Sequence, residues 1–124
     1  MSINSVNISG NLTRDCAEFS TPNYGGINFT VCVEARKKDQ SGEWVSVPNY
    51  IDCVMYGKRA DYFKTRLLKG SKVAVQGRLR YEEWDADDGR KRSKIRVICD
   101  EIETFSGQKQ VRVSDGYESD DVPF

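Results

Sequence analysis

The periodicity of the chain changes within Tyr50-Ile51-Asp52-Cys53-Val54-Met55-Tyr56-Gly57. Up to Tyr56 apolar side chains occupy every odd position, which is typical of a strand with one face in a core and the other outward. Over residues 57–70 apolar side chains fall instead at Ala60, Phe63 and Leu67. This spacing predicts an amphipathic helix of about three turns that ends at Gly70. The middle of the chain therefore predicts one strand followed by one helix.

Alternating segments lie on both sides of this helix. Strands are expected at about residues 6–13, 27–34, 44–56, 73–81 and 93–105. In the strand after the helix, the predicted inward positions are Val73, Val75, Gly77, Leu79 and Tyr81. Three strands, a helix and two strands indicate an all-β, five-stranded OB-fold barrel with one short helix across an end. An SH3-like barrel or another α+β meander also fits this pattern.

Length and composition exclude several classes of protein. The 124 residues are 38% apolar and 31% charged, which fits one folded domain. The sequence has no apolar run long enough to cross a membrane and no signal peptide at its start, so a cytoplasmic protein is expected. Histidine is absent, no C-x-x-C pair occurs and no Gly-Lys-Ser/Thr phosphate loop is found. We therefore expect no enzyme, no metal and no cofactor.

Charge is divided unevenly along the chain. Residues 1–105 carry 17 basic and 15 acidic side chains, whereas residues 106–124 carry 2 basic and 4 acidic ones. The C-terminal part is polar, contains scattered Gly and has no period, which predicts a disordered acidic tail. We expect a folded domain over 1–105, a short flexible linker over 106–119 and an acidic tip over 120–124. A pI near 6.3 argues against nucleic-acid binding unless basic groups gather locally.

The outward positions of the predicted strands combine aromatic and basic side chains. Tyr50, Tyr56 and Trp84 are expected to face solvent, together with Arg36 and Arg80. Exposed aromatic rings can stack on bases of any sequence, and nearby cations can neutralise phosphates. The alternative is that the same rings form a subunit interface or cover a surface groove. The outward face thus favours nucleic acid without deciding for it.

The last five residues are Asp120, Asp121, Val122, Pro123 and Phe124. An acidic segment that ends in an aromatic ring suits a partner pocket with an apolar floor and a basic rim. A solubilising tail has a similar composition.

The chain resembles bacterial and phage single-stranded DNA-binding proteins of the homotetrameric OB-fold type, over essentially its whole length. The matching segments are Val6-Asn7-Ile8-Ser9-Gly10-Asn11-Leu12, Asp52-Cys53-Val54-Met55-Tyr56-Gly57-Lys58, Leu68-Lys69-Gly70-Ser71-Lys72-Val73, Gly77-Arg78-Leu79-Arg80-Tyr81, Trp84 and the terminal Asp-Asp-Val-Pro-Phe. Their order, spacing and shared ending make the resemblance specific.

The resemblance implies a homotetramer that wraps single-stranded DNA, and it implies roles for particular residues. Tyr50, Tyr56 and Trp84 fall where the family places stacking aromatics. The implied phosphate contacts are Lys58, Lys69, Lys72 and Arg80, to which we add Arg36, at a position where some relatives have another aromatic. The tip would recruit replication, recombination and repair enzymes, and a nucleoid-associated location in the cytoplasm follows.

Besides Arg36, two further departures from the family bear on this interpretation. Asp52 and the pair Glu82-Glu83 bring negative charge close to the expected DNA path, and the linker before the tip is short. The favoured function is sequence-independent binding and protection of single-stranded DNA in replication, recombination and repair. The alternative is an OB-fold protein-interaction adaptor in replication restart that does not itself wrap single-stranded DNA.

Overall fold

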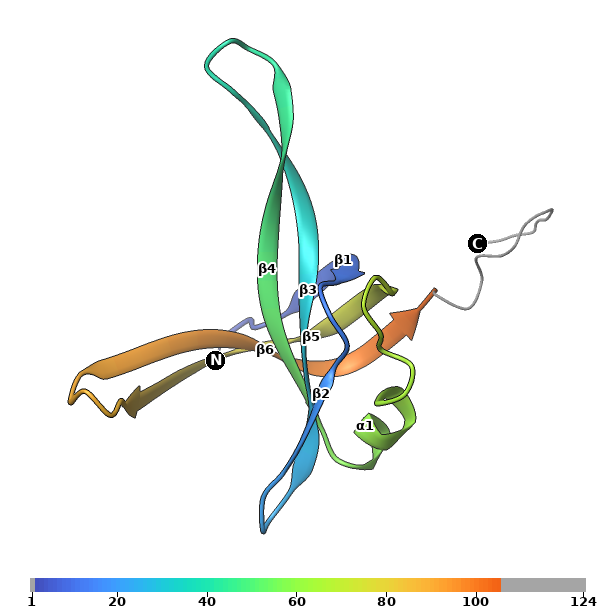
Figure 1. Cartoon of the computed structure of the whole chain (residues 1–124), viewed down its shortest axis with the longest axis vertical. Coiled ribbons are helices and arrows are strands. Elements are labelled where there is room, and N and C mark those ends of the chain that lie inside the picture. The colour runs from blue at the N-terminus through green and yellow to red at the C-terminus, as the bar shows by residue number, and fades with distance from the viewer. Residues whose placement is uncertain (1, 106–124) are drawn as a thin grey trace, which may run out of the picture.

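A computed structural model describes residues 2–105, and the predicted linker and tip lie outside the described residues. The described residues form six strands and one helix (Figure 1). The elements are β1 (Val6–Leu12), β2 (Ala17–Ser20), β3 (Gly25–Lys38), β4 (Trp44–Tyr56), α1 (Lys58–Phe63), β5 (Lys72–Asp85) and β6 (Lys91–Thr104). Within residues 2–105 no helix is long and apolar enough to cross a membrane.

Five of the strands close into a barrel. The sheet order is β1-β5-β6-β4-β3-β2, and an additional pairing between β1 and β3 closes it. All pairs are antiparallel except β4 with β6. Along the chain, α1 follows β4 and precedes β5, which are the third and fourth strands of the barrel. This arrangement confirms the predicted OB-fold barrel with one short helix.

The barrel interior holds the apolar side chains that alternation placed there. The largest fully buried side chains of the interior cluster are Ile27, Met55, Leu67, Val31, Val73, Val97 and Cys53. From the helical segment, Ala60 and Leu67 are buried in this core and Phe63 packs against it. The residues expected to face the core from the helix are therefore confirmed, although α1 itself is shorter than the predicted three turns. After Phe63 the chain continues in hydrogen-bonded turns that still deliver Leu67 to the core.

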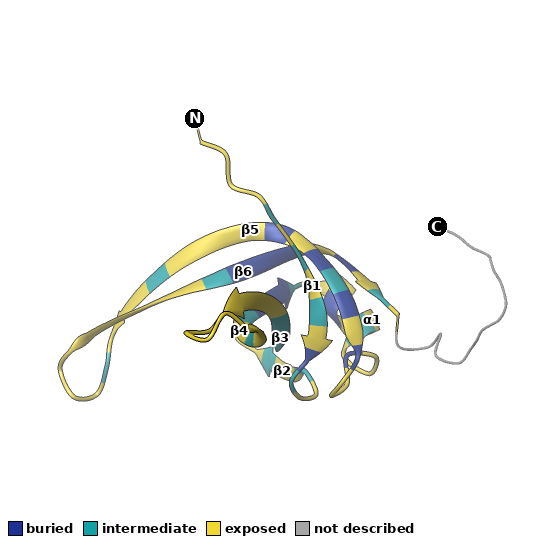
Figure 2. Cartoon of the chain, turned by 90° about the horizontal axis from the view of Figure 1, so that it is seen from above, coloured by how far each residue is buried: buried dark blue, intermediate teal, exposed yellow. Residues whose placement is uncertain are grey.

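Two hairpins extend beyond the barrel as two-stranded arms, one made by β3 and β4 and the other by β5 and β6 (Figure 1). Figure 2 shows that buried residues concentrate in the barrel, while both arms are largely exposed. The prediction that Leu79 and Tyr81 fill the core is therefore wrong. Their side chains are 49% and 61% exposed, because β5 has left the barrel at that point and no other element within residues 2–105 covers this face of the arm.

Two further details differ from the sequence interpretation. β2 is an additional short strand, which pairs with the start of β3 at the edge of the sheet. Val54 occupies a position predicted to face solvent, but its side chain is fully buried. It lies opposite Asn28 on β3, and the Arg96 side chain of β6 reaches across β4 to bond Asn28. This hydrogen bond joins β6 to β3 across the strand that carries Val54.

Candidate nucleic-acid interface

The strand register places the even-numbered side chains of β3, β4 and β5, and those of β6 as far as Ile98, on one side of the sheet, away from the core. We call this side the outer face. Beyond Ile98 the irregular β5–β6 register reverses the order, so that Ile102 faces the core. Opposite partners in a ladder share a face, and the pairs Tyr50 with Cys32, Val54 with Ile98 and Arg80 with Arg96 join the four strands. Its members include Arg36 of β3, Trp44, Tyr50, Asp52 and Tyr56 of β4, Arg80, Glu82 and Trp84 of β5, and Arg92, Lys94 and Arg96 of β6.

The three predicted stacking residues are distributed along this face. Tyr50 and Trp84 stand on the two arms and are 65% and 47% exposed. Tyr56 is half-buried and ends β4 opposite Gly26, at the far end of the β3–β4 ladder from the tip of that arm. The outer face thus carries one of these rings on each arm and the third, Tyr56, on the barrel.

Tyr56 and Arg80 are in direct contact. Arg80 Nη1 donates a hydrogen bond to the Tyr56 hydroxyl at 3.1 Å, and its guanidinium carbon lies 5.6 Å from the ring centroid. Two predicted site residues that are 24 positions apart in sequence therefore form one aromatic and cationic unit. A guanidinium beside an aromatic ring can contact a phosphate while the ring contacts a base.

A second aromatic and cationic unit lies on the β3–β4 arm. Lys38 Nζ is 5.4 Å from the centroid of the Trp44 ring. Arg36 pairs with Ser46 on the same face, two residues along each strand from this contact. The basic residues of the hairpin therefore accompany an exposed aromatic ring.

Three lysines that are predicted to contact phosphates belong to neither of these aromatic and cationic units. Lys58 begins α1, two residues beyond Tyr56, whereas Lys69 and Lys72 lie near the opposite end of β5 from Trp84. The backbone N–H of Lys69 bonds Asp15 Oδ1 at 2.7 Å, and Lys72 pairs with Asn11 of β1. The structure does not bring Lys69 and Lys72 to the cluster around Tyr56.

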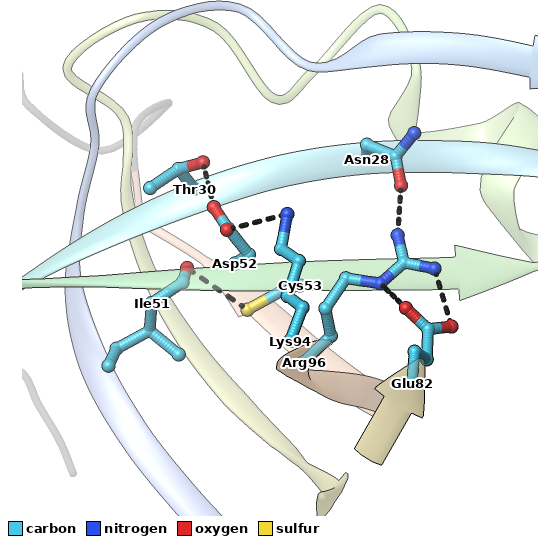
Figure 3. A network of polar contacts seen from close by, with 8 residues as sticks. All are labelled: Asn28, Thr30, Ile51, Asp52, Cys53, Glu82, Lys94 and Arg96. Atoms are coloured by element: carbon cyan, nitrogen blue, oxygen red, sulfur yellow. Dashed lines mark hydrogen bonds and ion pairs between the residues drawn. The ribbon is translucent and has the colours of Figure 1, made fainter. Parts of the chain in front are cut away.

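Carboxylates neutralise several cations of the outer face (Figure 3). Arg96 donates two hydrogen bonds to Glu82, at 2.8 and 2.9 Å, and a third to Asn28 Oδ1 at 3.0 Å. Lys94 Nζ lies 2.9 Å from Asp52 Oδ2, and Asp52 also accepts a hydrogen bond from the Thr30 hydroxyl. The basic segment of residues 90–96 is thus largely paired, a feature that the sequence did not reveal.

The pKa values of these carboxylates follow from their partners. Burial by itself would raise the pKa of Asp52, but hydrogen bonds from Lys94 and Thr30 and the charges of Lys94 and Arg96 lower it overall. The hydrogen bond from Arg96 lowers the pKa of Glu82 and correspondingly raises the pKa of Arg96. These groups are therefore all charged at neutral pH.

Neither thiols nor metal ligands form a second site in the part of the chain that the structure describes. Its four cysteines are free, and burial raises the pKa of Cys53 and of Cys99 to about 12. No group of three or more Cys, Asp or Glu side chains comes together there to hold a metal ion.

Comparison with protein families identifies the arrangement. Residues 3–105 match the model of the single-strand binding protein family. The chain belongs to that family. It is 37% identical over 116 residues to the single-stranded DNA-binding protein of Borreliella burgdorferi, covering 91% of this chain and 77% of that protein. It is 34% identical over 122 residues to the single-stranded DNA-binding protein of Aquifex aeolicus, covering 98% of this chain and 82% of that protein.

Solved structures of the family share the fold. A deletion mutant of the single-stranded DNA-binding protein from Thermus aquaticus superimposes with a TM-score of 0.74 at 29% identity, over 86% of this chain and 52% of that one. This chain thus spans about half the length of that protein. The Plasmodium falciparum protein of the family, in complex with single-stranded DNA, matches with a TM-score of 0.75 over 84% of this chain and 96% of its own. At 19% identity the latter shows the shared fold alone.

Proposed function

We propose that this protein binds single-stranded DNA without sequence preference and protects it during replication, recombination and repair. The observation that carries the proposal is the outer face, on which Tyr50, Tyr56 and Trp84 alternate with Arg36 and Arg80 across two arms and the barrel between them. Base–aromatic stacking accepts any base, and the adjacent cations supply phosphate contacts. Relatives named for single-stranded DNA binding support the same function.

Assembly and recruitment complete the proposal. We assign the chain to homotetramers, as the family resemblance implies. Apolar side chains on the opposite face of the β5–β6 arm support assembly, because Leu79, Tyr81 and Ile95 are 49–61% exposed in the single chain. The tip over residues 120–124 would recruit replication, recombination and repair enzymes, and Lys58, Lys69 and Lys72 would contact phosphates outside the central cluster. A nucleoid-associated, cytoplasmic location without membrane contact agrees with these roles.

A fluorescence titration tests the binding function. Trp44 and Trp84 are the two tryptophans of the chain, and both lie on the outer face. Stacking on bases quenches indole fluorescence, so oligo(dT) should quench strongly and a duplex of equal length should not. Added salt should weaken binding, with a slope of about −0.7 per neutralised phosphate.

Two variants on one arm provide a matched comparison. Trp84 faces outward on β5, whereas Tyr81 lies on the opposite face of the same arm. Trp84→Ala should weaken oligo(dT) binding by about 1–3 kcal/mol. Tyr81→Leu removes a ring from the other face but keeps an apolar side chain for assembly, so it should change binding by no more than about 0.5 kcal/mol. If the wild-type protein shows neither quenching nor competition by single-stranded DNA, the adaptor function replaces the proposed one.

A further inference from the structure

Three aromatic rings meet at the end of β4, where the sequence predicted only Tyr56. The ring centroids of Tyr24 and Tyr56 are 5.4 Å apart, those of Phe19 and Tyr56 5.9 Å, and those of Phe19 and Tyr24 6.2 Å. All three pairs are edge-on, with interplanar angles of 76–90°. Among them, Tyr24 is the most open to solvent, at 53% exposure. The cluster thus adds an exposed ring to the outer face next to a predicted stacking residue.

Strand register explains why the rings meet. Phe19 of β2 lies opposite Gly26 of β3, which in turn lies opposite Tyr56 of β4. Gly26 has no side chain, and Phe19 Cζ lies 3.1 Å from the place that a Cβ would occupy there. The Phe19 and Tyr56 rings therefore contact each other above the Gly26 backbone. A Cβ at Gly26 would also overlap the carbonyl oxygen of Met55, so only glycine fits between them.

A turn holds Tyr24 beside this pair. The Thr21 hydroxyl donates to the Tyr24 carbonyl oxygen at 2.8 Å and accepts from the Tyr24 N–H at 3.1 Å. The Thr21 N–H donates to the same carbonyl at 2.7 Å. Three hydrogen bonds between two residues fix the backbone on which the Tyr24 ring is carried. Neither neighbouring ring lies parallel to the Tyr24 ring, so neither covers it by stacking.

We propose that Tyr24 stacks on a base of the bound single strand, and that Thr21 is the residue that positions it. This inference rests on the proposed function and extends the binding surface from Tyr56 and Arg80 onto the β2–β3 hairpin. A strand that contacts Arg80 and Tyr56 reaches Tyr24 next, because the Tyr24 and Tyr56 rings are neighbours. An exposed, pre-positioned ring offers a base a partner at little cost in side-chain entropy.

Affinity measurements on folded variants test the role of the ring. With a labelled oligo(dT), Tyr24→Leu should bind roughly fivefold or more weakly, whereas Tyr24→Phe should keep wild-type affinity because it keeps the ring. Thr21→Val removes the hydroxyl and should weaken binding, whereas Thr21→Ser keeps the hydroxyl and should bind as the wild type does. Thermal unfolding of each variant checks that the fold is intact, and Trp84→Ala serves as the positive control.

A direct probe remains informative even where Tyr24→Leu fails to fold. In a chain with Trp44→Phe, Trp84→Phe and Tyr24→Trp, the introduced indole is the sole tryptophan, and oligo(dT) should quench it. If oligo(dT) binds this chain without quenching, or if Tyr24→Leu binds as tightly as wild type while Trp84→Ala does not, the inference is wrong and the proposed function stands. If the wild-type protein fails to bind oligo(dT), the proposed function itself fails.

Discussion

Individual carboxylates determine how much positive charge the outer face offers to a phosphate. Asp52 is paired with Lys94 and Glu82 with Arg96, so each carboxylate offsets the charge that its cation would offer to a phosphate. Among the described residues, neither Arg36 nor Arg80 takes part in an ion pair. We therefore expect phosphates to follow the β3–β4 arm and the Tyr56–Arg80 contact rather than the paired segment of β6.

Replacing Asp52 measures this internal competition. Asp52→Asn keeps an acceptor for Thr30 and releases Lys94, so binding of oligo(dT) at low salt should become tighter. The salt dependence should steepen by about 0.7 if Lys94 then contacts one phosphate. Asp61→Asn on α1 makes the same change of net charge away from the outer face and serves as the control. Equal affinities and slopes for the two variants would contradict the expectation.

The stability that the Asp52–Lys94 and Glu82–Arg96 pairs contribute depends on pH. The folded-state pKa values of Asp52 and Glu82 lie below their ordinary values of 3.8 and 4.5. Because a lowered carboxyl pKa stabilises the fold above the unfolded value, this contribution is fully present at neutral pH. It is lost only in acid, as the pH falls through the folded-state pKa values. Asp52 and Glu82 therefore stay charged near pH 7, and they continue to offset the charges of Lys94 and Arg96 there.

Sequence reasoning predicted the residues of the outer face better than their contacts. Alternation placed Tyr50, Tyr56 and Trp84 outward, because the period of a strand assigns each side chain to a face. It did not reveal that Arg96 crosses β4 to Asn28 or that Tyr24 joins Tyr56, because these contacts join segments that are distant in sequence. A tyrosine in a turn of Pro, Asn and Gly carries no periodic signal of its own.

The positions of most strands and of the helix are predictable from the sequence, but their length and burial also depend on the elements packed against them. A period of two correctly assigns Val73 and Val75 to the core but says nothing about where the barrel ends, so it misplaces Leu79 and Tyr81. β2 escapes prediction because a strand of 4 residues is too short to display a period. The helix is correctly located but ends at Phe63, and turns then carry Leu67 into the core.

At Gly77 two barrel strands lie so close together that substitution by a larger residue should destabilise the fold. A Cβ at Gly77 would overlap the carbonyl oxygen of Ile98, and the β5–β6 register is irregular between Gln76 and Gly77. Gly77→Ala should lower the free energy of unfolding by about 1–3 kcal/mol, seen as a lower urea midpoint with an unchanged slope.

A glycine in open space provides the comparison. Gly42, at the tip of the β3–β4 arm, has φ of 87°, and no atom lies within 4 Å of the place that a Cβ would occupy, so Gly42→Ala carries only backbone strain. That strain amounts to about 1–2 kcal/mol where the tip cannot relax. Because the overlap at Gly77 lies between two strands, Gly77→Ala should also separate β5 from β6 and speed amide exchange there, while Gly42→Ala leaves the barrel amides protected. Unchanged exchange in the barrel of Gly77→Ala would refute this expectation.

At the scale of the whole molecule, the two arms have faces of different character. The outer face carries aromatic and basic groups on both arms, whereas Leu79, Tyr81 and Ile95 lie on the other face of the β5–β6 arm. The order and spacing of the sequence motifs predicted the family that the family model then matched over residues 3–105. The separation of the two faces emerged only from the register of the folded strands.

Photo-crosslinking to oligo(dT) tests the assignment of the outer face most directly. After ultraviolet irradiation, crosslinked peptides are fragmented until each crosslink is assigned to one residue. We expect crosslinks at Tyr50, Tyr56 and Trp84, and none at Tyr81, which is 61% exposed on the opposite face of the arm that carries Trp84. Crosslinks at Tyr81 without any at Trp84 would contradict the assignment.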